Sequence, residues 1–315
     1  MQIVVLDGYA ANPGDLSWDD FRRIGTLSVY DRTPPEAAAQ RLRGADIALT
    51  NKTKIGAEQL AAAQNLRYIG VLGTGYDVID LDAAKRCGVV VANVPGYATD
   101  AVAQLTMALL LEICHHAGYH SREVMQGRWA HAADYCFWDY PLIELRGRCF
   151  GVLGTGSIGC AAAKLAKAFG MRVIGSSPHE REAFCGEYVP FHTLLKESDV
   201  LSLHCPATPE TQNCINADTL RQMKETAILI NTSRGALVNA QDLADALNEG
   251  RLYAAGVDVV EREPIVRSNP LLNAQNCIIT PHIAWAPLEA RRRLLETAAE
   301  NLRAFLAGSP IHRVG

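Results

Sequence analysis

The segment Val152–Gly159, which reads VLGTGSIG, constrains the fold of this chain more than any other. It has the pattern of a strand end, a glycine turn and the start of a helix. Gly154 permits the tight turn, Gly156 lets a phosphate approach the backbone, and Gly159 lets the helix pack closely on the strand. Because free N–H groups and the helix dipole then face the turn, the motif predicts a site for the pyrophosphate of a dinucleotide rather than an ordinary loop. The residues expected to line it are Gly154, Thr155, Gly156, Ser157 and Ile158.

Length and charge exclude several classes of protein. The chain has 315 residues, a length that favours two domains, and its net charge of −4 gives no support for binding nucleic acid. The longest apolar run, Leu105–Ile113, is too short to span a bilayer, and the amino terminus lacks the basic region of a signal peptide. The nine cysteines are scattered and odd in number, which indicates reduced thiols in a cytoplasmic protein without a membrane partner.

Strand-like runs alternate with helix-like runs, which predicts the α/β class with parallel sheets. We expect two doubly wound parallel sheets, one in each domain. The strands expected in the first are Ile3–Leu6, Leu27–Tyr30, Asp46–Leu49, Tyr68–Val71 and Val89–Ala92. Those expected in the second are Cys149–Leu153, Arg172–Gly175, Val200–Leu203, Ala227–Ile230, Ala254–Val257 and Cys277–Thr280.

Two long helical patterns indicate that the chain crosses between the domains twice. The helix at 101–113 leads into the second domain, and the amphipathic run at 287–307 returns to the first. We therefore predict a discontinuous substrate-binding domain, residues 1–100 with 283–315, and a dinucleotide-binding Rossmann domain, residues 101–282. A cleft between the domains is a favoured ligand site. Residues 115–140 carry aromatics without a clear period and are expected to form an extended arm or loop.

Three chemically capable side chains follow predicted strands of the second domain: Arg234, Glu263 and His282. Ligands of open α/β sheets bind outside the carboxyl ends of the strands. Arg234 can hold a carboxylate in a two-point fork, and His282 can deliver a proton near neutral pH. Glu263 can hold the imidazole and favour its charged form. Together the three predict chemistry on a carbonyl.

Each of these residues also has a purely structural interpretation. Arg234 can pair with a surface acid, Glu263 before a proline can be part of a plain loop, and His282 after a proline can be a loop histidine. Their joint placement on the sheet that carries the glycine turn favours the catalytic interpretation.

At these residues the chain resembles the D-isomer-specific 2-hydroxyacid dehydrogenase family, along nearly its whole length. The shared motifs are the glycine turn, Asn231–Gly235, Asp258–Pro264 and Thr280–His282. Within that family it is most similar to the glycerate dehydrogenases, also called hydroxypyruvate reductases. The features that carry this narrower resemblance are Asp7–Tyr9, Asn12–Trp18, Thr50–Thr53, Thr74–Asp77, Val102–Gln104, Trp138–Leu145 and His282–Ala286.

The resemblance implies a role for each site residue. Arg234 would bind the carboxylate and carbonyl of a 2-oxo acid, and Glu263 with His282 would form the acid–base pair. Asp258 and His282 would contact the nicotinamide. The turn Gly73, Thr74 and Gly75 would receive the substrate carboxylate, Asn51 and Lys52 would suit a small polar substrate, and Trp285 would wall the pocket or serve as a core or interface residue. The further cofactor contacts implied are Ser176, Ser177, Cys205, Pro206 and Thr232.

The cofactor pattern departs from that of a typical NAD enzyme. An acidic residue usually follows the second strand and binds the ribose hydroxyls, and Ser177 stands there instead. Nothing at that position repels a 2′-phosphate, although Pro178 replaces the arginine of the cleaner NADP pattern. The sequence predicts NAD(H) or NADP(H), with a slight preference toward accepting NADPH, unless Glu180 turns inward and restores the preference for NAD.

The histidines of the arm raise the question of a metal. His116 and His120 are four residues apart, the spacing of two ligands on one helix face, with His115, His131 and Asp134 nearby. Two histidines at this spacing without further ligands of defined spacing favour a solvated or interface face, so we predict no metal.

The sequence thus predicts reduction of hydroxypyruvate, and of glyoxylate, to the D-hydroxy acid. The same chemistry on another 2-oxo acid is an alternative. A second alternative is a non-catalytic dinucleotide sensor like the corepressors related to this family. The resemblance also implies a homodimer built with the arm.

Overall fold

The computed structural model describes residues 1–315 and divides them into two compact units. The first unit comprises Met1–Ala98 and Ala286–Gly315, and the second comprises Thr99–Trp285. The sequence placed these divisions after residue 100 and before residue 283, and the substrate-binding role of the first unit stays a prediction. No helix combines the length and the apolar character needed to cross a membrane.

The first unit is built on a five-stranded parallel sheet in the order β2-β1-β3-β4-β5. This is the order of flavodoxin-like sheets, in which ligands bind near the carboxyl ends of the strands. Strands β3 and β4 are buried throughout, because helices cover both faces of the sheet. The elements are β1 (Gln2–Val5), α1 (Gly8–Ala11), α2 (Asp19–Arg22), β2 (Thr26–Val29), α3 (Pro35–Leu42), β3 (Ile47–Thr50), α4 (Ala57–Ala62), β4 (Tyr68–Val71), α5 (Leu81–Arg86), β5 (Val90–Ala92) and α12 (Leu288–Leu306).

Helix α12 is far from the rest of the first unit in sequence but packs on its sheet. The rings of Phe305 and Tyr68 lie 4.9 Å apart, so the helix contacts β4 directly. Arg291 is 8% exposed and donates to Asp15 at 2.6 and 2.7 Å. This ion pair lowers the pKa of the Asp15 carboxyl below its ordinary value. Helix α12 therefore belongs to the same compact unit as Met1–Ala98.

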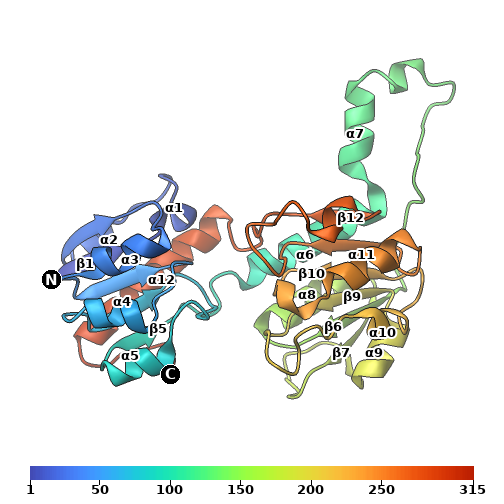
Figure 1. Ribbon diagram of the computed structural model, residues 1–315. Helices are drawn as coiled ribbons and strands as arrows, with labels where there is room; N and C mark the ends of the chain where they lie inside the picture. Colours follow the sequence, from blue (N-terminus) through green and yellow to red (C-terminus); the bar gives the residue numbers. More distant parts are fainter. The chain divides into compact units, whose positions relative to one another are not determined.

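The second unit has a seven-stranded parallel sheet in the order β12-β11-β10-β9-β6-β7-β8 (Figure 1). Strands β6 and β9 are neighbours, and the direction of winding reverses between them, which is the topological switch of a Rossmann sheet. The elements are α6 (Thr99–His115), α7 (Ala117–Met125), η1 (Trp129–His131), β6 (Cys149–Leu153), α8 (Ser157–Ala168), β7 (Arg172–Ser176), β8 (Glu187–Tyr188), α9 (Phe191–Glu197), β9 (Val200–Leu203), α10 (Ala217–Leu220), β10 (Ile228–Asn231), η2 (Gly235–Leu237), α11 (Ala240–Asn248), β11 (Ala254–Val257), η3 (Pro270–Asn273) and β12 (Cys277–Ile279). Two doubly wound parallel sheets are thus confirmed.

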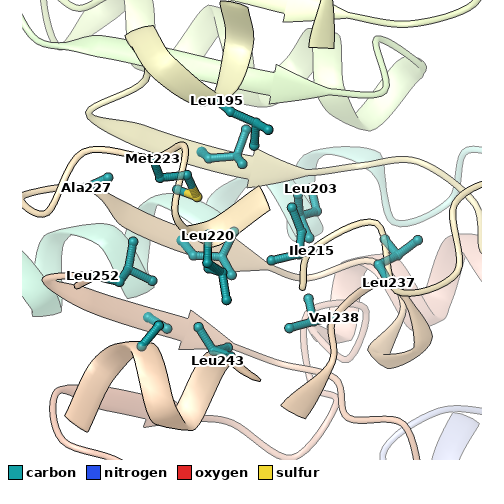
Figure 2. Close-up of a cluster of buried hydrophobic side chains, with 14 of the residues drawn as sticks. Leu195, Leu203, Ile215, Leu220, Met223, Ala227, Leu237, Val238, Leu243 and Leu252 are labelled. Atoms are coloured by element: carbon teal, nitrogen blue, oxygen red, sulfur yellow. The ribbon is translucent and has the colours of Figure 1, made fainter. Parts of the chain in front are cut away.

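Hydrophobic side chains fill both faces of the second sheet. On one face, Leu195 of α9, Leu220 of α10 and Leu243 of α11 meet side chains of the strands such as Leu203 (Figure 2). On the other face, α6 and α8 cover a cluster that includes the fully buried Phe150. Burial on both faces holds the carboxyl ends of the strands rigid, and the candidate site residues follow those ends.

The sequence predicted an extended arm or loop after α6, and the structure shows an arm that includes a helix (Figure 1). This helix is α7, which stands out from the layers of the second unit, and none of its residues is buried (Figure 1). Because no apolar face of α7 packs on the sheet, its sequence lacks the period that reveals a helix. The expectation that His116 and His120 share a helix face was wrong. His116 lies before the helix with φ of +47°, and its ring stacks on Tyr140.

Candidate active site

The glycine turn between β6 and α8 has the geometry that its sequence indicates. Gly154 has φ of +93°, and a Cβ there would lie 2.6 Å from the backbone nitrogen of Cys205. A Cβ on Gly159 would lie 2.1 Å from the carbonyl oxygen of Gly154. A Cβ on Gly156 would meet nothing within 4 Å. Only the middle glycine therefore faces open space, where a phosphate group can approach the backbone.

The start of helix α8 is suited to an anion. Gly156 provides no side-chain cap, so the first N–H groups of this 12-residue helix are not satisfied by a side chain of the N-cap. Ser157 and Ile158 carry two of these groups. Thr155 is buried and its hydroxyl lies 2.9 Å from that of Tyr188. These donors and the positive end of the helix dipole fit the pyrophosphate of a dinucleotide.

The end of strand β7 lies beside the glycine turn. Gly154 donates its N–H to the carbonyl of Ser176 at 2.9 Å, and Ser177 follows directly and is half-buried. The side chain of Glu180 is exposed. Arg181 lines a cavity of about 650 Å³ together with Ser157 and Lys164. The structure therefore holds a neutral hydroxyl next to the turn, where NAD enzymes carry a carboxylate.

Cys205 and Pro206 follow β9, the neighbour of β6, and Thr232 follows β10, the next strand of the sheet. Cys205 is buried, and a hydrogen bond with the Cys214 thiol together with burial raises its pKa well above the ordinary range. It therefore remains a neutral thiol rather than a nucleophile. Pro206 is exposed, whereas Thr232 is 7% exposed and its hydroxyl lies 3.0 Å from that of Thr106.

His282 and Glu263 form a hydrogen-bonded pair after β12 and β11. The Nδ1 atom of His282 lies 2.6 Å from Oε2 of Glu263, and the two side chains are 25% and 33% exposed. A carboxylate on Nδ1 fixes the orientation of the ring and leaves Nε2 as the second ring nitrogen. Because the pair is partly exposed, a substrate can reach it. This geometry is that of an oriented general acid–base histidine.

Asp258 anchors the loop that carries His282. The carboxylate is 1% exposed and accepts the Thr280 hydroxyl at 2.6 Å and the N–H groups of Ile283 and Ala284 at 2.9 Å each. The Asp258 carbonyl also accepts the N–H of His282 at 2.8 Å. The sequence predicted a nicotinamide contact for Asp258 and missed this anchoring role, although the Asp258 and Thr280–His282 motifs were both visible. His282 itself has φ of +54°, and these bonds hold it there.

Arg234 lies in a loop pressed against the segment before Glu263. A Cβ on Gly235 would lie 1.9 Å from the carbonyl carbon of Val260, so the two loops touch through backbone atoms. Asn231 braces the Arg234 loop from within, since its side chain donates to the carbonyl of Arg234 at 2.9 Å and accepts the N–H of Ser233 at 3.1 Å. The structure thus brings the Arg234 and Glu263 loops together at the ends of β10 and β11. Trp285 is half-buried shortly after His282.

A second histidine near the turn is unsuited to proton transfer. His204 follows β9, its Nε2 lies 2.8 Å from the Ser202 hydroxyl, and its Nδ1 is enclosed without a hydrogen-bond partner. Burial lowers the pKa of His204 to about 4. It is therefore neutral at physiological pH, which leaves His282 as the candidate acid.

The remaining candidate residues lie in the first unit, at the ends of β3 and β4. Asn51 is 8% exposed and donates its side-chain amide to the carbonyl of Leu72, whereas Lys52 is exposed. In the Gly73–Gly75 turn, the Thr74 hydroxyl donates to Val94 at 3.0 Å and Asn93 donates to the Thr74 carbonyl at 2.7 Å. These two bonds tie the turn to the residues that directly follow β5.

Comparisons with known proteins match this architecture. The family model "D-isomer specific 2-hydroxyacid dehydrogenase, NAD binding domain" matches residues 107–284, most of the second unit. The chain is 50% identical to hydroxypyruvate reductase of Blautia hydrogenotrophica, over all of this chain and 99% of that protein. It is 39% identical to glycerate dehydrogenase of Methylorubrum extorquens, over 89% of each chain.

A solved structure matches the whole chain. It is the NADPH-dependent glyoxylate/hydroxypyruvate reductase of Sinorhizobium meliloti, in complex with NADP and malonate. Its TM-score is 0.86 at 28% identity, with 100% of this chain and 96% of that chain covered. With the family model matching more than half of its length, this chain belongs to the D-isomer-specific 2-hydroxyacid dehydrogenase family.

Proposed function

We propose that this chain is an NAD(P)H-dependent reductase of hydroxypyruvate, and of glyoxylate, that forms the D-hydroxy acid. The observation that carries the proposal is the His282–Glu263 pair, joined at 2.6 Å on the sheet that holds the glycine turn. The 50% identity to a hydroxypyruvate reductase over the full chain supports the choice of substrate.

The residues of the second unit account for the chemistry. Reduction of a 2-oxo acid adds a hydride to carbon and a proton to oxygen, and the bound nicotinamide supplies the hydride. His282 delivers the proton from Nε2, while Glu263 holds Nδ1 and stabilises the charged ring. Arg234 binds the substrate carboxylate and polarises the carbonyl.

The proposal also assigns substrate contacts to residues of the first unit. The N–H groups of the Gly73–Gly75 turn receive the carboxylate, and Asn51 with Lys52 suits the hydroxyl of a small polar acid. Trp285 of the second unit limits the size of the group that the site accepts.

Initial rates test the proposal. Hydroxypyruvate, glyoxylate and pyruvate are offered separately with NADH and with NADPH at equal concentration, and oxidation of the nicotinamide is followed. We expect hydroxypyruvate to give the highest kcat/KM. A preference for a larger 2-oxo acid would retain the chemistry and change the substrate. Cofactor binding without turnover of any 2-oxo acid would favour a dinucleotide sensor.

Ser177→Asp is expected to shift the cofactor preference toward NADH. A carboxylate at the end of β7 accepts hydrogen bonds from the ribose hydroxyls and repels a 2′-phosphate. The ratio of kcat/KM for NADPH to that for NADH should fall by about tenfold or more. Glu180→Gln is the control and should leave the ratio unchanged. A shift toward NADPH in that control would identify Glu180 as the discriminating residue instead.

We further propose that the arm mediates a homodimer. The side chains of Met125, Tyr135 and Trp138 in the arm are 85%, 89% and 63% exposed. Large apolar side chains gathered on one exposed segment are typical of a surface that binds another protein chain. Within the arm, Arg128 forms an ion pair with Asp139, and the Tyr119 hydroxyl donates to the same carboxylate at 2.7 Å. These contacts keep the arm ordered and lower the pKa of Asp139 well below its usual range.

Light scattering should therefore give about twice the 34.2 kDa chain mass, and Trp138→Glu should shift the protein toward the monomer. Leu306→Glu alters a side chain 41% exposed on α12 of the first unit and should leave the mass unchanged. A monomeric wild-type protein would contradict the proposal.

A further inference from the structure

Asp7 is a carboxylate that binds three consecutive backbone N–H groups of another loop. It follows β1, and its Oδ1 accepts the N–H of Asn51 at 2.8 Å. Its Oδ2 accepts the N–H groups of Lys52 and Thr53 at 2.5 and 2.7 Å. All three belong to the loop after β3, the strand that pairs with β1. Both oxygens of Asp7 are therefore used to hold one short loop.

The loop held by Asp7 is also tied to the next strand. The Asn51 side chain donates to the carbonyl of Leu72, immediately before the Gly73–Gly75 turn. The Thr50 hydroxyl donates to the Thr53 carbonyl at 2.9 Å and closes the loop on itself. The ends of β1, β3 and β4 are thus joined in one hydrogen-bonded network, and Asp7 is its only carboxylate acceptor for the 51–53 backbone.

We propose that Asp7 is a positioning residue for the substrate, which acts through the backbone of the 51–53 loop. With its N–H groups held, the loop presents the side chains of Asn51 and Lys52 in one arrangement. The inference rests on the proposed function, since that function assigns substrate contacts to these two side chains. Asp7 does not need to touch the substrate for this role.

The role depends on an ionised carboxylate, because three donors converge on two oxygens. Charge-assisted hydrogen bonds of this kind are short and about twice as strong as neutral ones. An asparagine at position 7 has one acceptor oxygen, and in either orientation its NH₂ group would face at least one of the three N–H groups. Two donors facing each other repel, so the loop would leave its present conformation.

Asp7→Asn tests the inference, with Asp46→Asn as the matched control. Asp46 is also a half-buried carboxylate of the first unit that accepts a backbone N–H, from Gln2 at 2.7 Å, but it lies away from the loop. We expect Asp7→Asn to raise KM for hydroxypyruvate by at least about tenfold, with a much smaller change in kcat. The dissociation constant of the cofactor should not change, and the control should behave as the wild-type protein.

A double-mutant cycle with Lys52→Ala separates positioning from general destabilisation. If Asp7 acts through the loop, Asp7→Asn raises KM less in the Lys52→Ala background than in the wild-type protein. If the two substitutions changed KM by independent factors that simply multiply, the inference would be overturned while the proposed function stood. The same holds if Asp7→Asn left KM unchanged in a protein that turns over hydroxypyruvate. Absence of turnover in the wild-type protein would overturn the proposed function and the inference together.

Discussion

His282→Asn is expected to lower kcat for hydroxypyruvate reduction by about 10³-fold, within the range that a general acid contributes. Asparagine tolerates the positive φ of 54° at this position better than most residues. Its side-chain NH₂ can replace Nδ1 as the donor to Glu263, but nothing in it replaces Nε2. The substitution therefore removes the proton donor while preserving the backbone and the contact with Glu263.

Cofactor binding separates this effect from unfolding. Apart from the proposed nicotinamide contact of His282, the cofactor contacts at the glycine turn and the end of β7 do not involve this side chain. A fluorescence titration with NADH or NADPH should therefore give a dissociation constant of wild-type order. His192→Asn, an exposed histidine of α9, makes the same chemical change on the surface and should leave kcat unchanged. Turnover retained in His282→Asn would assign the proton to another group and remove the catalytic interpretation of the pair.

Much of the fold follows from the sequence because buried parallel strands appear as continuous apolar runs. The observed bounds of β4, β6, β9 and β11 are those predicted. Strand β8, Glu187–Tyr188, was missed because two residues, one charged, carry no period. The bounds of helix α7 were not predicted, because the helix has no buried face that would impose a period on its sequence.

For the candidate site, the sequence predicted the side chains that carry the chemistry but not the side chains that hold the loops. Side chains that carry chemistry, such as His282 and Glu263, stand in motifs at strand ends, and the structure places them in contact. The side chains that hold the loops of the candidate site were not predictable in that role, because their partners are distant in sequence. Asp7 binds a loop 44 to 46 residues away, and Asp258 binds one 22 to 26 residues away. Sequence pattern reveals periodicity and motifs, whereas these bonds depend on which strands become neighbours.

Gly235→Ala is expected to lower kcat/KM by about 10²-fold, although it adds only one methyl group and removes no side chain of the proposed chemistry. The new Cβ would lie 1.9 Å from the Val260 carbonyl carbon and 2.3 Å from the Glu261 nitrogen. A real Cβ essentially never lies within 3.0 Å of another heavy atom, so the two loops must separate by at least about 1 Å. Overpacking of this kind costs about 1–3 kcal/mol of stability, which thermal unfolding would measure.

The separation matters because each loop carries one half of the proposed chemistry. Arg234 precedes Gly235, and Val260 donates its N–H to Oε1 of Glu263 at 3.2 Å. Displacing Val260 therefore moves the carboxylate that orients His282 away from the guanidinium that binds the substrate. Gly56→Ala is the control, since its Cβ would meet nothing closer than 3.5 Å, and it should leave kcat/KM unchanged. If Gly235→Ala retained wild-type kcat/KM, the contact between the two loops would not be what sets the distance between Arg234 and Glu263.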